Sequence, residues 1–244
     1  NTTLDPFLSA VLKVAVSKSP DEYRKAINEL PRTGRPDQVA SLINFISWKH
    51  QHGGGLTAHE RDSLELCARR TESQIVQAIA SALGHHFSAE AKWPIDLLTR
   101  LKAREQKDGE QILQALAQIT KKQKGCVEPR IVSQCLSNVG SFCNCDDTHE
   151  ERSLGEIAKH FPVPVFEHFL RLVDSALNDE SATTIQIGVR GLPTLGAFGD
   201  ADYINTEINI QWTKAQTDVK SRGARIALIR ALIWSDSPSA ETCM

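Results

Sequence analysis

The chain has few aromatic residues, no large excess of charge of one sign and no long apolar run. Its 244 residues include 4 Trp and 2 Tyr, and 28 Lys and Arg stand against 30 Asp and Glu, for a formal net charge of −2. Proteins that bind nucleic acids or anionic membranes carry an excess of Lys and Arg, which this composition lacks. We therefore expect neither as the partner, although a local basic stripe is compatible with the composition.

The apolar stretches are too short to cross a membrane. The longest, Ile226–Ile229 and Ala231–Trp234, are separated by Arg230, whereas a spanning helix needs roughly 20 apolar residues. Leu8–Val16 contains Lys13, which is wrong for a secretory signal. The six cysteines are too sparse and uneven for a disulfide scaffold. We expect a soluble, cytoplasmic chain and, since the first residue is not Met, a fragment or a processed form.

Helix-start patterns recur along most of the chain. Ser19-Pro20 places a side-chain acceptor before a residue without an amide hydrogen, and a Ser, Thr or Asp followed three residues later by Glu or Gln predicts a capping box. Apolar residues between these starts recur at helical spacing, and no stretch alternates as a strand does. The sequence predicts roughly twelve or thirteen short helices and no sheet. The capping spacing occurs at Thr57 with Glu60, Thr71 with Gln74, Asp108 with Gln111, and Ser153 with Glu156.

Alternate predicted helix starts are separated by similar numbers of residues. One short helix cannot bury its apolar stripe alone, whereas stacked hairpins share a continuous core. The predicted fold is an all-α, right-handed α-solenoid of about six or seven helical hairpins, forming one domain over residues 1–244. The starts are Asp5, Pro36, Thr71, Asp108, Thr148, Ser181 and Asp218, which are 31 to 40 residues apart.

Two stretches near the end of the sequence resemble a known repeat family. Leu192–Asp202, with the sequence LPTLGAFGDAD, resembles the first helix and turn of a HEAT repeat. Val219-Lys220 and the small and apolar residues that follow it resemble the second helix. Residues 205–212 depart from the Val-Arg start of that family. The resemblance is confined to about the last 60 residues, and it implies a HEAT or armadillo-like architecture.

A short pattern also recurs after predicted helices, at Ser17–Pro20, Ala91–Pro94 and Ala158–Pro162. It resembles the Ser-Lys-Trp-Pro repeats of large bacterial type III effectors, which implies an α-solenoid segment of a secreted effector. The same residue types are typical of ordinary helix boundaries, because Lys complements the dipole of a last turn and Pro begins the next helix.

Motifs for catalysis and cofactor binding are missing. The sequence contains no Walker loop, no dinucleotide-binding glycine pattern, no nucleophile elbow and no His-Glu-x-x-His zinc motif. Two histidine pairs, His50 with His52 and His85 with His86, fall at predicted helix C-termini, where the terminal carbonyls favour an imidazolium. We expect a protein that is not an enzyme and has no cofactor.

One cluster has the chemistry of a metal site. Cys143, Cys145 and His149 bring two thiols and an imidazole within one short segment, and zinc takes about four N or S donors in a tetrahedral array. Cys126 or Cys135 would supply the fourth donor. The alternative is a polar loop with unreactive thiols that caps the next helix, and the sequence leaves both interpretations open.

Four residues are candidates for partner contact, because Trp and Arg anchor interfaces more often than other residue types. Trp48 and Trp93 are the surface candidates among the tryptophans, although Trp48 also suits a core between repeats. Arg69 and Arg70, with the basic residues at positions 100, 102 and 104, would line a nucleic-acid-binding face of the kind built by helical-repeat DNA glycosylases. Interleaved carboxylates favour a solvated rim instead.

The expected function is a non-catalytic protein–protein interaction scaffold. It would bind a partner protein or peptide through the groove of the solenoid, which one helix of each hairpin would form. The alternatives are a nucleic-acid-binding helical-repeat protein similar to a DNA glycosylase, and a solenoid segment of a secreted bacterial effector.

Overall fold

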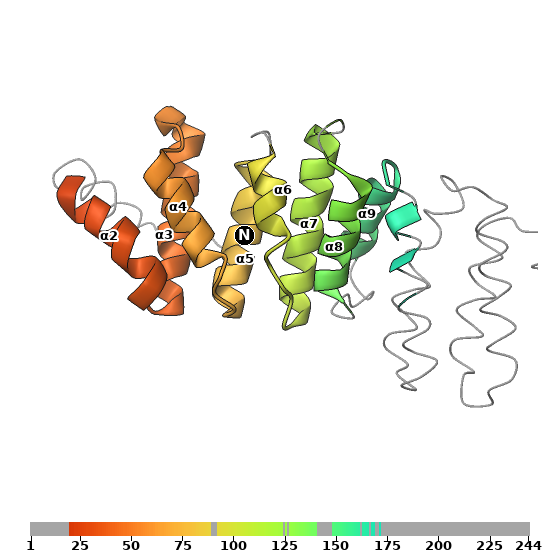
Figure 1. The fold of residues 1–244 in the computed structure, drawn as a ribbon, viewed down its shortest axis with the longest axis horizontal. Coiled ribbons are helices and arrows are strands. Elements are labelled where there is room, and N and C mark those ends of the chain that lie inside the picture. Colours follow the sequence, from red (N-terminus) through yellow and green to blue (C-terminus); the bar gives the residue numbers. More distant parts are fainter. Residues whose placement is uncertain are drawn as a thin grey trace, which may run out of the picture.

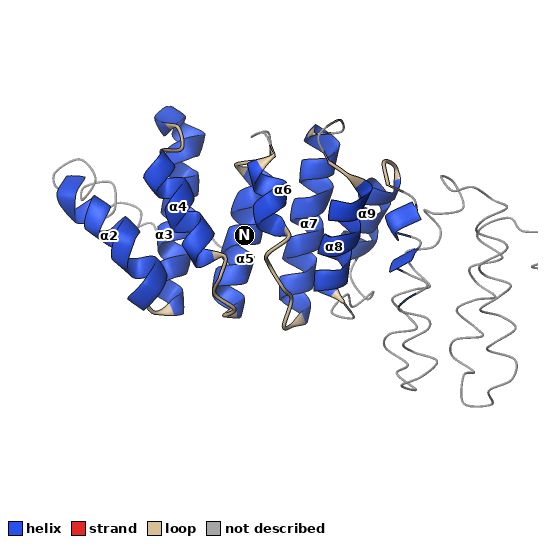
Figure 2. Ribbon diagram, viewed as in Figure 1, coloured by secondary structure: helices blue, strands red, loops and turns tan. Residues whose placement is uncertain are grey.

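The computed structural model of the chain describes residues 20–88, 92–123, 125, 127–140, 148–161, 163–165, 167–168 and 171. The regular structure of these residues is helical, without a strand (Figure 2). The prediction of an all-α chain is confirmed over this part. The elements are α2 (Pro20–Thr33), α3 (Pro36–Lys49), the π-helical turn η1 (His50–Gly54), α4 (Ala58–Cys67), α5 (Ser73–His85), α6 (Trp93–Leu98), α7 (Gln106–Lys122), α8 (Pro129–Val139) and α9 (Thr148–Ala158).

The capping pattern at the start of α4 forms as predicted. The Glu60 amide donates to Thr57 Oγ1 over 3.3 Å, and the Thr57 amide donates to Glu60 Oε2 over 2.9 Å. These two bonds satisfy backbone donors that a first helical turn leaves without a partner. The preceding turn ends at Gly53 and Gly55, whose φ angles of 84° and 58° favour glycine. Together these residues fix where the chain reverses between α3 and α4.

Three predicted starts are displaced. Glu72, not Thr71, precedes α5, and Asp108 lies in the first turn of α7, which begins at Gln106 after Glu105. Ser153 lies inside α9, which already begins at Thr148. The Ser153 prediction was wrong because the helix has already begun at Thr148 and continues past Ser153. A Ser followed three residues later by Glu is compatible with the interior of a helix as well as with its start. The predicted starts at Asp5, Ser181 and Asp218, and the HEAT-like segment, lie outside the described residues.

The described helices lie in a row, and each packs on elements close to it in the chain (Figure 1). One series of contacts joins α3 to α5, α5 to α7, and α7 to α9, while α2 contacts α4 and α6 contacts α8. The helices in each series are separated in the sequence by one other helix. The substantial contacts therefore run between neighbours or next neighbours, without a long-range closure among the described helices.

A continuous apolar core runs between the helices. It includes Ile43 of α3, Ile79 of α5, Leu116 of α7 and Val132 of α8, each with at most 1% of its surface exposed. Gly84 allows α5 and α7 to approach closely, since a Cβ at this position would lie 2.7 Å from the Ala115 Cα. This approach and the core contacts of α3 with α5 place α3, α5 and α7 side by side.

Two buried carboxylates tie the helix ends together. Glu60 is 1% exposed and accepts hydrogen bonds from Tyr23 Oη and Lys49 Nζ over 2.6 and 2.7 Å. Asp108 is 0% exposed and accepts bonds of 3.0 Å from Ser73 Oγ and Gln77 Nε2. Because a buried charge is tolerated only when it is paired or hydrogen-bonded, each carboxylate fixes the relative position of the elements around it.

Among the described helices, none combines the length and the apolar character that crossing a bilayer requires.

Candidate functional site

An open groove with a volume of about 1250 Å³ crosses α3, α5 and α7. The lining residues of each helix are mostly three or four positions apart, so each helix contributes one face to the groove. The lining residues are Asp37, Ala40 and Asn44 of α3, Gln51 of η1, Gln74, Gln77, Ala78, Ser81 and His85 of α5, the adjacent His86, and Lys107, Glu110, Gln111 and Gln114 of α7.

Side-chain amides dominate the groove. Asn44, Gln74, Gln111 and Gln114 make no hydrogen bond to another part of the chain that the structure describes. Gln77 differs, because its Nε2 donates to Glu105 Oε1 and to Asp108 Oδ1, each over 3.0 Å. Each amide carries both a donor and an acceptor. The groove therefore offers donors and acceptors on three alternate helices, with Gln77 held in a fixed orientation.

Short side chains lie between these amides. Ala40 of α3, and Ala78 and Ser81 of α5, line the same groove and leave room above the helix backbones. Ala78 is buried, with 8% of its surface exposed. A ligand backbone can therefore approach the helices closely enough to reach the longer amides on both sides.

The charged residues of the groove nearly balance. Asp37 and Glu110 contribute carboxylates, and Lys107 contributes an ammonium group. Asp37 already pairs with Arg35 over 3.0 Å, and Glu110 accepts a hydrogen bond from Gln106 Nε2 over 3.0 Å. Because these charges are few and partly paired, neutral polar groups dominate what the groove presents.

One end of the groove carries imidazoles. His85 and His86 close α5, and their ring centroids are 6.4 Å apart. The pKa of His86 lies below its ordinary value, first because the ring is partly buried and then because His85, His50 and Lys122 oppose its positive charge. At neutral pH this end of the groove therefore holds a half-buried, predominantly neutral imidazole.

The structure places the predicted tryptophans outside the groove lining. Trp48 is half-buried, with its ring stacked 6.0 Å from Phe45 and 4.4 Å from His52. Trp93 begins α6, where its Nε1 donates to Glu65 over 3.2 Å and its ring lies 5.5 Å below the guanidinium of Arg61. Both indoles take part in contacts within the chain, and their role in binding a partner stays a prediction.

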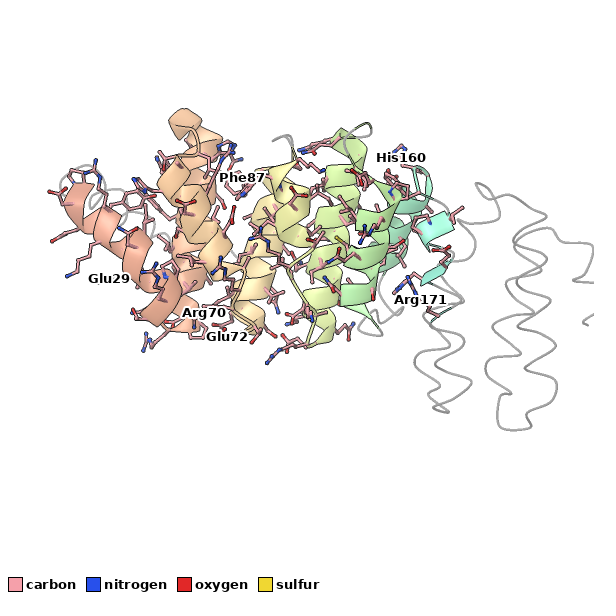
Figure 3. All side chains as sticks on the ribbon, in the orientation of Figure 1. Glu29, Arg70, Glu72, Phe87, His160 and Arg171 are labelled. Carbon is pink, nitrogen blue, oxygen red and sulfur yellow. The ribbon has the colours of Figure 1, made fainter. Side chains whose placement is uncertain are left out.

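The two predicted arginines differ in their surroundings. Arg69 is exposed, whereas Arg70 donates to the Gly34 carbonyl over 2.8 Å and pairs with Glu72. Figure 3 shows Arg70 and Glu72 together at one edge of the row of helices, with Phe87 at the opposite edge. That pairing holds the pKa of Glu72 down at about 2. Arg70 thus joins the turn after α2 to the start of α5.

Most of the predicted metal cluster falls outside the described residues. Cys143 and Cys145 are among those residues, and for His149 only its backbone position in α9 is described. Cys135, one suggested fourth donor, is buried in α8, and burial raises the pKa of its thiol to about 12. Within the described part of the chain, no three His, Cys, Asp or Glu side chains are grouped to hold a metal ion. Zinc binding stays a prediction.

Sequence reasoning missed the amides of the groove. The available signal was the spacing of Gln74, Gln77 and Ser81 on one helix and of Lys107, Gln111 and Gln114 on another. Polar residues at helical spacing are usually a solvated face. Their significance depends on α3, α5 and α7 lying side by side, which the spacing alone does not determine.

Comparison with protein-family models, with curated proteins and with solved structures finds no match to this chain.

Proposed function

We propose that the chain is a right-handed α-solenoid of the HEAT or armadillo type that binds an extended peptide segment of a partner protein without catalysis. The peptide lies in the groove across α3, α5 and α7. The observation that carries this proposal is the series of side-chain amides, Asn44, Gln74, Gln111 and Gln114, on three alternate helices that form one groove.

The packing order of the described helices supports the solenoid. In a solenoid each repeat contacts only its neighbours, and one helix of each hairpin lines a shared surface. The contacts from α3 to α5 and from α5 to α7 have this order. The predicted total of about six or seven hairpins extends the same order along the chain.

The chemistry of the amides supports a peptide ligand. Each peptide unit of an extended chain carries one N–H donor and one C=O acceptor, and an Asn or Gln side chain offers the complementary pair. Because main-chain groups are common to all sequences, such contacts hold a segment in an extended conformation irrespective of its side chains. The short Ala40, Ala78 and Ser81 give that backbone room to approach.

The test is affinity selection from a displayed library of random twelve-residue peptides, followed by fluorescence anisotropy with the enriched peptides. Wild type is compared with the triple variant Asn44→Ala, Gln74→Ala, Gln111→Ala. At about 1 kcal/mol for each lost hydrogen bond, we expect affinity to fall by about a hundredfold.

The matched control removes exposed amides elsewhere. Asn28→Ala on α2 and Gln134→Ala on α8 lie outside the groove and should leave the affinity unchanged. Enrichment of no peptide on the wild-type chain, or equal losses in the groove and control variants, would contradict the proposal.

The groove gives less support to the nucleic-acid alternative. Asp37 and Glu110 place carboxylates on its surface, and they would repel phosphates. Arg100, one residue of the predicted basic stripe, pairs with Glu65 over 3.1 Å. A gel-shift titration of duplex DNA at two salt concentrations tests this alternative, which requires binding that weakens steeply as salt rises.

A further inference from the structure

The end of the groove near the last turn of α5 has a different character from the rest. His85 is exposed and His86 is half-buried, and both line the groove. Two more basic groups act on His86 from neighbouring elements, His50 from η1 and Lys122 from α7. Three elements therefore direct basic side chains to one position.

Lys122 is held at this end of the molecule. Its Nζ donates to Ser88 Oγ over 2.7 Å, just after α5, and the neighbouring Gln123 donates to the Ser88 carbonyl over 2.8 Å. These bonds keep the ammonium group beside the turn that carries the histidines. The positive charge at this end is thus positioned by the fold.

The carboxylates of the groove lie near its other edge. Asp37 is in the first turn of α3, and Glu110 is near the start of α7. Lys107 lies in the first turn of α7. The charged groups that act on His86 are all basic, namely His85, His50 and Lys122, and neither Asp37 nor Glu110 is among them.

We infer that the groove selects a peptide that places a carboxylate against His85 and His86. This inference rests on the proposed peptide binding and adds the chemistry of one ligand position. A carboxylate there accepts hydrogen bonds from the imidazoles and offsets the repulsion among His85, His86, His50 and Lys122. It comes from an Asp or Glu side chain or from the C-terminus of the peptide.

Protonation and binding are then linked. The bound carboxylate favours the imidazolium form, so the pKa of His86 is higher in the complex than in the free protein. Affinity rises as pH falls through the pKa of the complex, and it levels off below the pKa of the free protein. A rise of one pKa unit corresponds to about tenfold tighter binding of the protonated form.

The experiment selects twelve-residue peptides from a random displayed library at about pH 6 and at about pH 7.5, which bracket the ordinary titration of histidine. The enriched peptides are then titrated by anisotropy as free acids, as C-terminal amides, and with Asp and Glu replaced by Asn and Gln. We expect carboxylate-bearing peptides to be enriched at the lower pH and to bind more tightly there, by up to about tenfold for a rise of one pKa unit. If the pH dependence of binding is lost in the C-terminal amide, the carboxylate is the C-terminus of the peptide. If it is lost in the Asn and Gln version, the carboxylate is an Asp or Glu side chain.

The variant His85→Gln, His86→Gln should lose this pH dependence, and His85→Gln alone, at an exposed position, should reduce it. His59→Gln, at an exposed histidine of α4 outside the groove, should retain it. Affinity that is retained at both pH values when the C-terminus is amidated and Asp and Glu are replaced together, or a pH effect that persists in the double variant, would overturn the inference while leaving the proposed function intact. Enrichment of no peptide at either pH would instead overturn the proposed function.

Discussion

Lys49 at the end of α3 and Glu60 near the start of α4 form an ion pair in which Nζ lies 2.7 Å from Oε1. The Glu60 side chain is 1% exposed, and the same Oε1 accepts a bond from Tyr23 of α2. Thr57 donates to the other carboxylate oxygen, Oε2, over 2.8 Å through its hydroxyl. One carboxylate thereby joins three helices and the turn between two of them.

The first prediction concerns the neutral variant Glu60→Gln. It leaves the Lys49 ammonium half-buried without its partner, and breaking a buried pair is strongly destabilising. We expect the free energy of unfolding to fall by about 3 kcal/mol, measured by urea unfolding followed by circular dichroism. Glu29→Gln on the exposed surface of α2 is the control and should change stability little. Equal effects of the two substitutions would show that the Glu60 network is unimportant.

The second prediction concerns acid. Burial acts to raise the pKa of Glu60, but hydrogen bonds from Lys49, Tyr23 and Thr57 outweigh it and leave the pKa below its ordinary value. The folded state therefore gains stability above the unfolded pKa of about 4.3 and loses it as pH falls through the lower folded pKa. The stability difference between wild type and Glu60→Gln should narrow from about pH 6 to about pH 3. A constant difference over this range would contradict the assignment.

The third prediction concerns the close approach of α5 and α7. Alanine has the higher helix propensity, by about 1 kcal/mol over glycine. Nevertheless, Gly84→Ala should destabilise the chain by about 1–3 kcal/mol, because its Cβ would lie 2.7 Å from the Ala115 Cα and the helices must separate. Gly125→Ala, where a Cβ would meet nothing within 4 Å, is the control. Stabilisation by Gly84→Ala in a thermal melt would be inconsistent with this packing.

The fourth prediction separates the two neighbouring arginines. Arg70 donates to the Gly34 carbonyl and pairs with Glu72, so Arg70→Ala should lower the free energy of unfolding by about 1–2 kcal/mol. Arg69→Ala should have little effect on stability, because this side chain is exposed. Urea unfolding of both variants tests the contrast. Equal free energies of unfolding for the two variants would show that the contacts of Arg70 do not stabilise the fold.

Local chemistry made the helices of the described residues predictable. The capping box of Thr57 and Glu60 and the Pro36 start of α3 are short-range patterns that need no knowledge of packing, and both are found. Ser153 has the same capping pattern and lies inside α9. A capping pattern shows where a helix can begin, and the residues before it determine whether the helix has already begun.

The candidate site was less accessible to sequence reasoning, which favoured tryptophan and arginine as anchors. Arg70 and Trp93 have partners within the chain, and these partners lie far away in the sequence, at Gly34 and Glu65. The groove instead consists of Gln and Asn residues that are individually unremarkable. Only the side-by-side packing of α3, α5 and α7 turns them into one surface.

The most direct test of the central claim is nuclear magnetic resonance of the ¹⁵N-labelled chain during titration with an enriched peptide. The account predicts that the side-chain amide signals of Asn44, Gln74, Gln111 and Gln114 shift together and saturate, while those of Asn28 and Gln134 stay unchanged. Saturable binding with shifts at Asn28 and Gln134 and none at the groove amides would contradict it.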